Sequence, residues 1–251
     1  MNKILRCTAL LLAIVTGFNC SKQSAENAAF SGATGTGGSL ARFTIAGNYL
    51  YTVDKQNLKV FSIADPANPV LKNTQPVGFE IETIYPFGDK LFIGSTSVIH
   101  IFSIANPEQP QKLSTAISPT VMRRCDPVVA KDTVAYATLR TNGPCGGVSS
   151  TLAVYDIKDI INPVQKAALT VSEPYGLGYS DTALYVCDRR GMYVFSIASA
   201  YQPRYISTIN PAAWFIDVIP YGNTLICWVS DGVMLYDITN KTSPQFIVKI
   251  S

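Results

Sequence analysis

The chain repeats one short pattern about every forty residues. An aromatic residue, a polar residue and isoleucine recur at spacings of 41, 53, 40 and 41 residues, in the segments Phe61–Ile63, Phe102–Ile104, Tyr155–Ile157, Phe195–Ile197 and Tyr236–Ile238. A polar residue and a proline begin seven residues after each aromatic, as Asn68–Pro69, Gln109–Pro110, Asn162–Pro163, Gln202–Pro203 and Ser243–Pro244. An internal period of roughly 40 to 45 residues is typical of propellers and solenoids. The sequence therefore contains five copies of one structural unit.

Each unit has the pattern of a small β-sheet. A Gly or Asp turn, which favours a tight hairpin, precedes an apolar strand in every unit, at Gly47, Gly88, Asp132, Asp181 and Gly222. In the last unit, alternation and β-branched or aromatic content predict strands over residues 214–220, 224–229, 233–237 and 245–250. We therefore predict an all-β fold, a five-bladed β-propeller of about four antiparallel strands per blade, over residues 39–251.

The phase of the repeat bears on how such a ring closes. The chain starts on an inner strand near Leu40 and reaches an outer strand at Ile250. No strand is then shared between the first and last blades, so closure would rest on side-chain packing alone. An open or distorted ring is the alternative.

The first unit also resembles a known family. Residues Leu58–Pro69 look like the LVIVD repeat of bacterial and archaeal surface proteins, which has a hydrophobic strand, an aspartate-bearing turn and Asn-Pro. Two later units, at Asn106–Pro110 and Ser199–Pro203, lack the aspartate. The resemblance covers residues 40 to 251 and implies an extracytoplasmic β-propeller, and it carries no catalytic residues over to this chain.

Residues 1–19 have the layout of an export signal. Lys3 and Arg6 precede an apolar run over residues 8–16, which is too short to span a membrane. A short Gly-Phe-Asn stretch and then Cys20 follow, which resembles a bacterial lipoprotein processing site, although Asn19 departs from the usual small residue. We expect Cys20 to carry a lipid anchor, and secretion without a lipid is the alternative. Residues 20–38 are polar and glycine-rich, as in a flexible tether.

The charge balance of the chain limits the kinds of partner that it can bind. Charged residues make up 15% of the chain and the formal net charge is +3. Removing residues 1–19 takes away two cations and no acids, which leaves +1. This balance argues against nucleic-acid binding. We expect an exported protein anchored to the bacterial envelope, at the outer membrane, that touches the membrane through the lipid alone and needs no cofactor.

The third unit carries about a dozen extra residues around Arg140–Ser150. Cys145 lies in this insertion and Cys125 begins the same unit's inner strand, so in an exported protein we predict a disulfide between them. Cys187 and Cys227 are one residue out of register, point to different sides of their sheets and are expected to be buried thiols. The wide cysteine spacing lacks the CxxC pairs of a zinc site, and His100 is expected to be structural.

Ligands of propellers usually lie over the central channel, beside the loops that enter the inner strands and those that join second to third strands. The candidate binding residues in these loops are Arg123, Arg124, Arg140, Tyr175, Arg189, Arg190 and Trp214, beside Lys55, Glu80, Glu82, Glu173 and Asp231. Arginine supplies bidentate hydrogen bonds and aromatic rings supply contact area, so this mixture is typical of a recognition surface. A solvated rim with internal salt bridges is the alternative.

Three functions follow from these features. The first is a non-enzymatic envelope scaffold that binds a protein, peptide or glycan through this face. The second is a glycan-active hydrolase that uses the central carboxylates Asp126 and Asp217, with Glu82 nearby. The third is a structural component of an envelope complex, which predicts exposed apolar edge strands.

Overall fold

The computed structural model describes residues 37–117, 127–141, 150–210 and 212–251. Within these ranges the chain forms twenty β-strands and no helix. The strands make five sheets of four, and in each sheet consecutive strands pair antiparallel. The prediction of an all-β, five-bladed propeller is confirmed.

The strands of the first three sheets have the following bounds. The first sheet contains β1 (Phe43–Ala46), β2 (Tyr49–Val53), β3 (Asn57–Ser62) and β4 (Val70–Pro76). The second contains β5 (Ile81–Phe87), β6 (Lys90–Ser95), β7 (Val98–Ser103) and β8 (Gln111–Ile117). The third contains β9 (Val128–Lys131), β10 (Val134–Leu139), β11 (Ser150–Asp156) and β12 (Val164–Val171).

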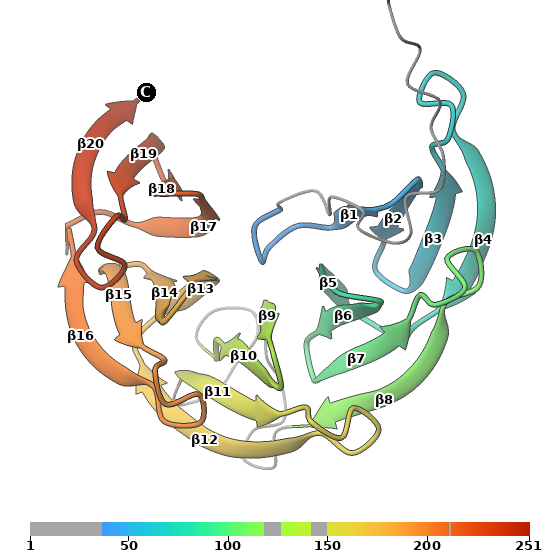
Figure 1. Cartoon of the computed structure of the whole chain (residues 1–251), viewed down its shortest axis with the longest axis horizontal. Coiled ribbons are helices and arrows are strands. Elements are labelled where there is room, and N and C mark those ends of the chain that lie inside the picture. Colours follow the sequence, from blue (N-terminus) through green and yellow to red (C-terminus); the bar gives the residue numbers. More distant parts are fainter. Residues whose placement is uncertain (1–36, 118–126, 142–149, 211) are drawn as a thin grey trace, which may run out of the picture. The chain divides into compact units, whose positions relative to one another are not determined.

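The last two sheets complete the set. The fourth contains β13 (Pro174–Ser180), β14 (Ala183–Asp188), β15 (Gly191–Ser196) and β16 (Arg204–Ile209). The fifth contains β17 (Phe215–Tyr221), β18 (Thr224–Val229), β19 (Gly232–Asp237) and β20 (Gln245–Ile250), within one or two residues of the predicted strands. Figure 1 shows the sheets following one another around a common centre, with the first strand of each sheet innermost and the fourth outermost.

The hairpin turns repeat in all five sheets. The turn between the first and second strands places its Gly or Asp at positive φ each time, at Gly47 (58°), Gly88 (55°), Asp132 (53°), Asp181 (52°) and Gly222 (58°). Glycine and aspartate are among the residues that tolerate this conformation. An isoleucine amide then bonds the carbonyl of the residue after the turn residue in every sheet, at 2.7 to 2.8 Å, from Ile63, Ile104, Ile157, Ile197 and Ile238. The five units are therefore structurally equivalent.

The aspartate-bearing turn has a local role. The Asp65 carboxylate accepts hydrogen bonds from the Ala67 amide at 3.1 Å and from the Asn68 side chain at 2.8 Å. Asp159 makes the same pair of bonds to Ile161 and Asn162. The aspartate and the Asn of Asn-Pro thus stabilise the connection from the third to the fourth strand.

Apolar cores join each sheet to the next. Four clusters of buried side chains lie between the first and second, second and third, third and fourth, and fourth and fifth sheets. Tyrosine hydroxyls on three second strands also donate to backbone carbonyls of the following sheet: Tyr51 to Pro107 (3.0 Å), Tyr136 to Ala200 (2.8 Å) and Tyr185 to Lys241 (2.7 Å). The equivalent position is Phe92 in the second sheet and Ile226 in the fifth.

The predicted buried thiols lie in one of these cores. Cys187 and Cys227 are free, and both lie in the cluster between the fourth and fifth sheets. The two cysteines point to different sides of their own sheets, as predicted. Because the side of the fourth sheet that carries Cys187 faces the side of the fifth sheet that carries Cys227, both thiols lie in the same core. His100 is also buried, on β7, and burial lowers its pKa to about 4. This placement agrees with a structural role.

The fifth and first sheets are joined differently. No apolar cluster of the described residues links them, and no strand is shared. Instead, the buried Asp217 on β17 accepts hydrogen bonds from Ser39 Oγ at 3.2 Å and from the Leu40 amide at 3.1 Å. Ser39 Oγ in turn accepts from the Leu177 amide at 2.7 Å. We call these contacts the Asp217 latch. The expected closure by side-chain packing is replaced by hydrogen bonds at the inner ends of the sheets.

Candidate functional site

The loops predicted to share one face do so. Because the first three strands of each sheet are antiparallel, the entry to the first strand and the loop from the second to the third lie at the same end. Thr96, in the β6–β7 loop, donates to Glu80 at the entry of β5 (2.6 Å). The Ser230 amide, between β18 and β19, bonds the Trp214 carbonyl at the entry of β17 (3.1 Å). We call this end of the sheets the loop face.

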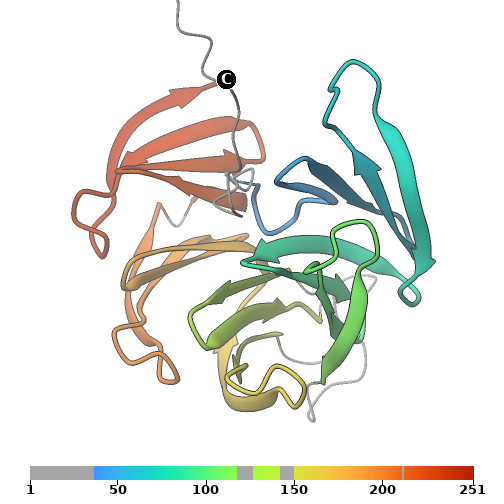
Figure 2. The same ribbon diagram turned by 45° about the vertical axis from the view of Figure 1, so that its right-hand side comes forward.

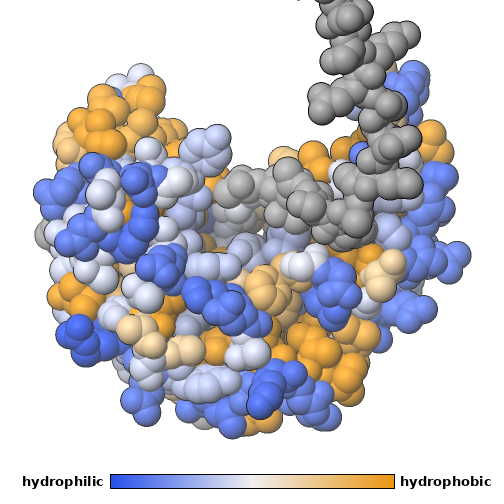
Figure 3. Space-filling model, in the orientation of Figure 1, coloured by the Kyte–Doolittle hydropathy of each residue, from blue (hydrophilic) through white to orange (hydrophobic). Residues whose placement is uncertain are grey.

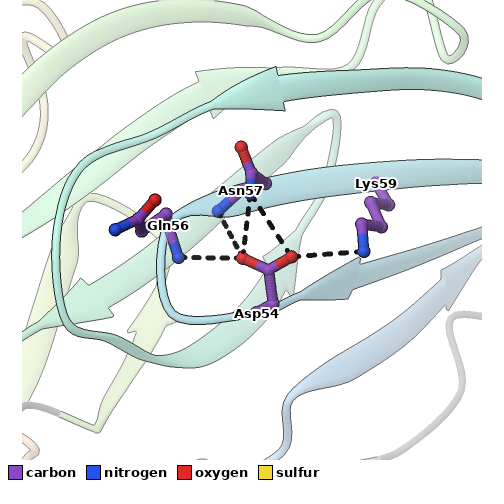
Figure 4. A network of polar contacts seen from close by, with 4 residues as sticks. All are labelled: Asp54, Gln56, Asn57 and Lys59. Carbon is purple, nitrogen blue, oxygen red and sulfur yellow. Dashed lines mark hydrogen bonds and ion pairs between the residues drawn. The ribbon is translucent and has the colours of Figure 1, made fainter.

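Aspartates cap hairpins on the loop face. Asp54, after β2, accepts bonds from the amides of Gln56 (2.9 Å) and Asn57 (2.8 Å), and it also contacts the Asn57 side chain and Lys59 (Figure 4). These donors, chiefly the two amides, lower the pKa of Asp54 to about 2. Asp54 therefore stays ionised and fixes the β2–β3 turn.

Asp188 holds the equivalent place in the fourth sheet with a different environment. Its carboxylate accepts bonds from the amides of Glu173 (2.7 Å) and Arg190 (2.9 Å), but the side chain is fully buried. Burial raises the pKa of Asp188 despite these bonds. Asp188 thereby positions the loop that carries Arg189 and Arg190.

Four of the predicted binding residues form one row across three sheets. The Arg140 guanidinium, from the third sheet, lies 4.3 Å from the centre of the Tyr175 ring. Tyr175 of β13 is 5.4 Å from Trp214, with the ring planes at 54°. The Arg189 guanidinium lies 5.4 Å from the Trp214 ring. Cations over aromatic faces are attracted by the ring quadrupole. We call Arg140, Tyr175, Trp214 and Arg189 the cation–aromatic row.

Carboxylates lie beside the row. Glu173 pairs with Arg189 at 3.5 Å, where the arginine side chain is 60% exposed. Glu82 is half-buried, and burial raises its pKa while nearby Arg42 and Arg140 oppose the rise. The row thus combines two cations, two rings and flanking acids, which suits a ligand that has both charged and ring-shaped parts.

A hollow of about 360 Å³ adjoins the row at the fifth sheet. Its lining includes Arg189, Asn210, Trp214, Ser230, Asp231 and Lys249. The Trp214 indole nitrogen is buried and has no hydrogen-bond partner within the described part of the chain. An unpaired N–H beside an exposed arginine can donate a hydrogen bond to a ligand oxygen.

The other predicted residues have different outcomes. Arg190 is exposed, and among the described residues its side chain contacts no aromatic ring. Lys55 and Glu80 lie on the loop face of the first and second sheets, outside the three sheets of the row. Cys20, Arg123, Arg124, Cys125, Asp126 and Cys145 lie outside the described residues. The lipidation, the disulfide and this part of the binding face stay predictions.

Asp217, one carboxylate of the hydrolase hypothesis, is engaged in the latch. It is buried, and an added Cβ at Gly38 or Gly176 would fall 2.1 Å from its oxygens. Burial raises its pKa to about 6 despite bonds from Leu40, Val218 and Ser39. The tight enclosure leaves no room for a sugar at this carboxylate.

Sequence reasoning missed a second surface. Leu169, Val171, Tyr193, Phe195 and Tyr205 line an apolar groove of about 470 Å³ between the outer parts of the third and fourth sheets. The three rings contact one another edge to face at 6.0 to 6.5 Å. Alternate aromatics at Tyr193 and Phe195 are a signal, but the groove also needs the neighbouring sheet, which lies distant in sequence.

Among the described residues, 37–117, 127–141, 150–210 and 212–251, no three or more His, Cys, Asp or Glu side chains gather as a metal site would require. No helix in those ranges is long and apolar enough to cross a membrane.

The fold and its repeated turns define a β-propeller repeat protein. In agreement, the LVIVD repeat matches residues 37–75, which form the first sheet and the segment that leads into it. No curated protein sequence matches the chain.

Solved structures support the same fold. A protein from Lactobacillus plantarum has a TM-score of 0.67 at 15% identity, over 80% of this chain and 67% of that one. A functionally unknown protein from Desulfotomaculum acetoxidans has a TM-score of 0.65 at 8% identity, over 86% of this chain and 68% of that one. A periplasmic gluconolactonase from Pseudomonas aeruginosa has a TM-score of 0.62 at 14% identity, over 81% of this chain and 67% of that one. At these identities the likeness concerns the fold alone.

Proposed function

We propose that this protein is a non-enzymatic binding scaffold of the bacterial cell envelope, which holds a protein, peptide or glycan on its loop face. The cation–aromatic row carries the proposal. Three sheets contribute to the row, and arginine with tyrosine and tryptophan is the combination that dominates recognition surfaces. The partly exposed row beside the 360 Å³ hollow offers both charge and contact area.

A binding experiment tests this role. The mature protein is immobilised and exposed to detergent-solubilised envelope from the cells that produce it, and then to arrays of acidic and neutral glycans. Arg189→Gln removes one cation of the row, and we expect it to reduce retention of the bound species at least tenfold. Arg204→Gln on the outer strand β16 is the matched control and should bind as the original protein does. Equal retention by both variants would contradict the proposal.

The envelope location rests on the N-terminal sequence. We propose that residues 1–19 are removed and that Cys20 is lipidated, which would leave residues 20–38 as a tether. Metabolic labelling with a fatty-acid analogue should mark the original protein and fail to mark Cys20→Ser. A non-reducing mass map should show Cys125 joined to Cys145. Free thiols at both positions would refute the disulfide.

A structural role in an envelope complex is the second candidate, and one observation favours it. Every residue of β20 is exposed, including Phe246 (58%), Ile247 (53%) and Ile250 (57%). An exposed apolar edge strand marks an interaction site. The hydrolase alternative has less support, because Asp217 is enclosed by the latch and the other carboxylate, Asp126, lies outside the described residues.

A further inference from the structure

The repeat separates side chains that the fold requires from side chains that a single sheet adds. Tyr193 precedes the repeated aromatic Phe195 by two residues, and Tyr205 is paired with Phe195 on the neighbouring strand. The residues equivalent to Tyr193 are Lys59, His100, Ala153 and Met234, and those equivalent to Tyr205 are Leu71, Lys112, Gln165 and Phe246. Among the five described sheets, the fourth alone has rings at both positions. The other four sheets form without this pair of rings, so the pair is available for another role.

These two rings line the apolar groove between the third and fourth sheets, which we call the outer groove. Tyr193, Phe195 and Tyr205 form one side of it. The four consecutive residues Leu169 to Ser172 form the other side. Its volume of about 470 Å³ lies within the range of roughly 300 to 1,000 Å³ that is usual for binding pockets. The outer groove can therefore take a large side chain of a partner.

Exposed apolar side chains alone do not select this place. Leu71 on β4 is 53% exposed, and Figure 3 shows hydrophobic residues at several places along the outer rim. The outer groove differs because three rings contact one another within it, at 6.0 to 6.5 Å between ring centres. Aromatic side chains gathered at a recess are typical of the anchor points of protein interfaces.

The strand that borders the outer groove has a free edge. β12 is the end strand of its sheet and pairs only with β11 among the described strands. Figures 1 and 2 show β12 on the outside of the third sheet, next to the fourth sheet. Because successive residues of a strand point to opposite sides, four consecutive residues in the lining mean that the backbone at the end of β12 borders the groove. Unpaired amides and carbonyls at such an edge can pair with an added strand.

An unpaired cation lies at the loop-face end of the outer groove. Arg190 is exposed, and among the described residues its side chain makes no ion pair. Burial raises the pKa of the Tyr193 hydroxyl, and Arg190 lies close enough to oppose this rise. Glu173, which follows the groove residue Ser172, is paired with Arg189 instead, at 3.5 Å. Arg190 is therefore free to pair with an acidic group of a partner.

We propose that the outer groove binds an extended segment of a partner protein, which adds as a strand to the free edge of β12. A large apolar side chain of this segment lies among Tyr193, Phe195 and Tyr205, and an acidic side chain pairs with Arg190. The outer groove is separate from the cation–aromatic row, so this inference goes beyond the proposed function.

The chemistry of the outer groove favours a peptide over a glycan. The ring planes of Tyr193, Phe195 and Tyr205 stand at 71° to 82° to one another, so they offer no shared flat platform for a sugar ring. Leu169 and Val171 add aliphatic surface opposite the rings. The edge of β12 supplies main-chain hydrogen bonds to an extended peptide, and the groove and Arg190 then select its side chains.

A phage-displayed library of random dodecapeptides tests the proposal. The library is selected in parallel on the immobilised original protein, on Tyr205→Glu and on Leu71→Glu. Leu71→Glu is the matched control, because Leu71 is the equivalent residue of the first sheet and is exposed to the same degree, 53% against 52%. We expect the original protein and the control to enrich peptides that combine alternate large apolar residues with an acid, and Tyr205→Glu to lose this enrichment. Equal enrichment on all three proteins, or on none, would overturn the proposal.

An enriched peptide, made synthetically, then separates the parts of the site. In fluorescence anisotropy, Tyr205→Glu should weaken its binding by about tenfold. Arg190→Gln should weaken it by about threefold and reduce its dependence on salt. Because both replaced side chains are exposed, unchanged unfolding midpoints are expected and check that the variants fold. Amide hydrogen exchange should slow at alternate residues of β12 when the peptide binds, and unchanged exchange there would refute strand addition.

Two other occupants of the outer groove are tested beside the peptide. Sedimentation of the original protein alone checks for a second copy of the chain, and a glycan array checks for a sugar. A dimer that Tyr205→Glu disperses, or glycan binding that Tyr205→Glu abolishes, would overturn the proposal. The retention experiment with Arg189→Gln reports on the cation–aromatic row, so the proposed function and this inference can fail separately.

Discussion

Two junctions of the same domain are built from different interactions. Between the fourth and fifth sheets, a buried apolar cluster is joined by the bond from Tyr185 to the Lys241 carbonyl. Between the fifth and first sheets, the Asp217 latch holds the inner ends, no apolar cluster of the described residues joins the two sheets, and Phe43 (59%) and Trp228 (55%) are exposed. Burial stabilises in proportion to the apolar area removed from water, whereas a hydrogen bond adds about 1 kcal/mol net. The first junction should therefore govern stability, and the second should position the ends.

The largest expected effect compares equivalent positions at the two junctions. Tyr185→Ala removes a fully buried ring and should lower the free energy of unfolding by about 3 to 5 kcal/mol. Ile226→Ala, at the equivalent position of the fifth sheet, should cost about 1 kcal/mol, because the side chain is partly exposed. Urea unfolding of both variants measures the difference. Equal losses would mean that Ile226 is buried in solution.

The burial of Asp217 within the latch should be visible in the pH dependence of stability. The pKa of Asp217 rises from 3.8 to about 6 on folding, so the folded state binds the extra proton between these values. Stability from this group is complete below pH 3.8 and falls by about 3 kcal/mol as the pH rises through 6. Asp217→Asn should remove this fall.

A second group titrates in the opposite sense and is separated by subtraction. The pKa of His100 is lowered from 6.5 to about 4, so its contribution is lost as the pH falls through this range. The difference between the original protein and Asp217→Asn, measured from pH 3 to 8, reports Asp217 alone because both retain His100. A flat difference would show that burial does not perturb the Asp217 carboxyl.

The smallest effect concerns the cation–aromatic row, which spans the third to fifth sheets. Arg140→Gln removes the guanidinium over Tyr175 and should cost about 0.5 to 1 kcal/mol. It should also raise the pKa of Glu82 further, because Arg140 opposes that rise in the folded protein. Carboxyl NMR titration of Glu82 measures the shift, with Arg204→Gln as the control. An unchanged Glu82 pKa would show that Arg140 does not act on this carboxyl.

The sequence predicted the sheets well because the signals are local. Turn residues such as Gly47 and Asp181 fix hairpins through their own backbone, and the aspartate of Asp65–Asn68 bonds within its own turn. The repeat then multiplies each signal five times. The four residues of the row were among the seven candidates from the sequence, and their role in binding stays a prediction.

The contacts between distant units were harder to foresee. Gly38 and Ser39 lie at the end of a polar, glycine-rich stretch, and nothing in that composition indicates a bond to Asp217, 178 residues beyond Ser39. The stacking of Tyr175 on Trp214 likewise depends on how neighbouring sheets are rotated. The sequence did contain one signal of how the sheets pack. The residue at the position equivalent to Tyr51 is aromatic in the first four units and isoleucine in the fifth. The change to Ile226 marks the sheet that no other described sheet covers.

Amide hydrogen exchange of the original protein and Asp217→Ala tests most directly whether the Asp217 latch joins the first and last sheets. In the original protein, the Leu40 and Leu177 amides should exchange slowly, because Asp217 and Ser39 accept their bonds. In the variant, the Leu40 amide should exchange much faster while the Ile197 amide, inside the fourth sheet's repeated turn, stays protected. Equal acceleration of exchange at the Leu40 and Ile197 amides in the variant would contradict the account. Fast exchange of the Leu40 amide in the original protein would contradict it as well.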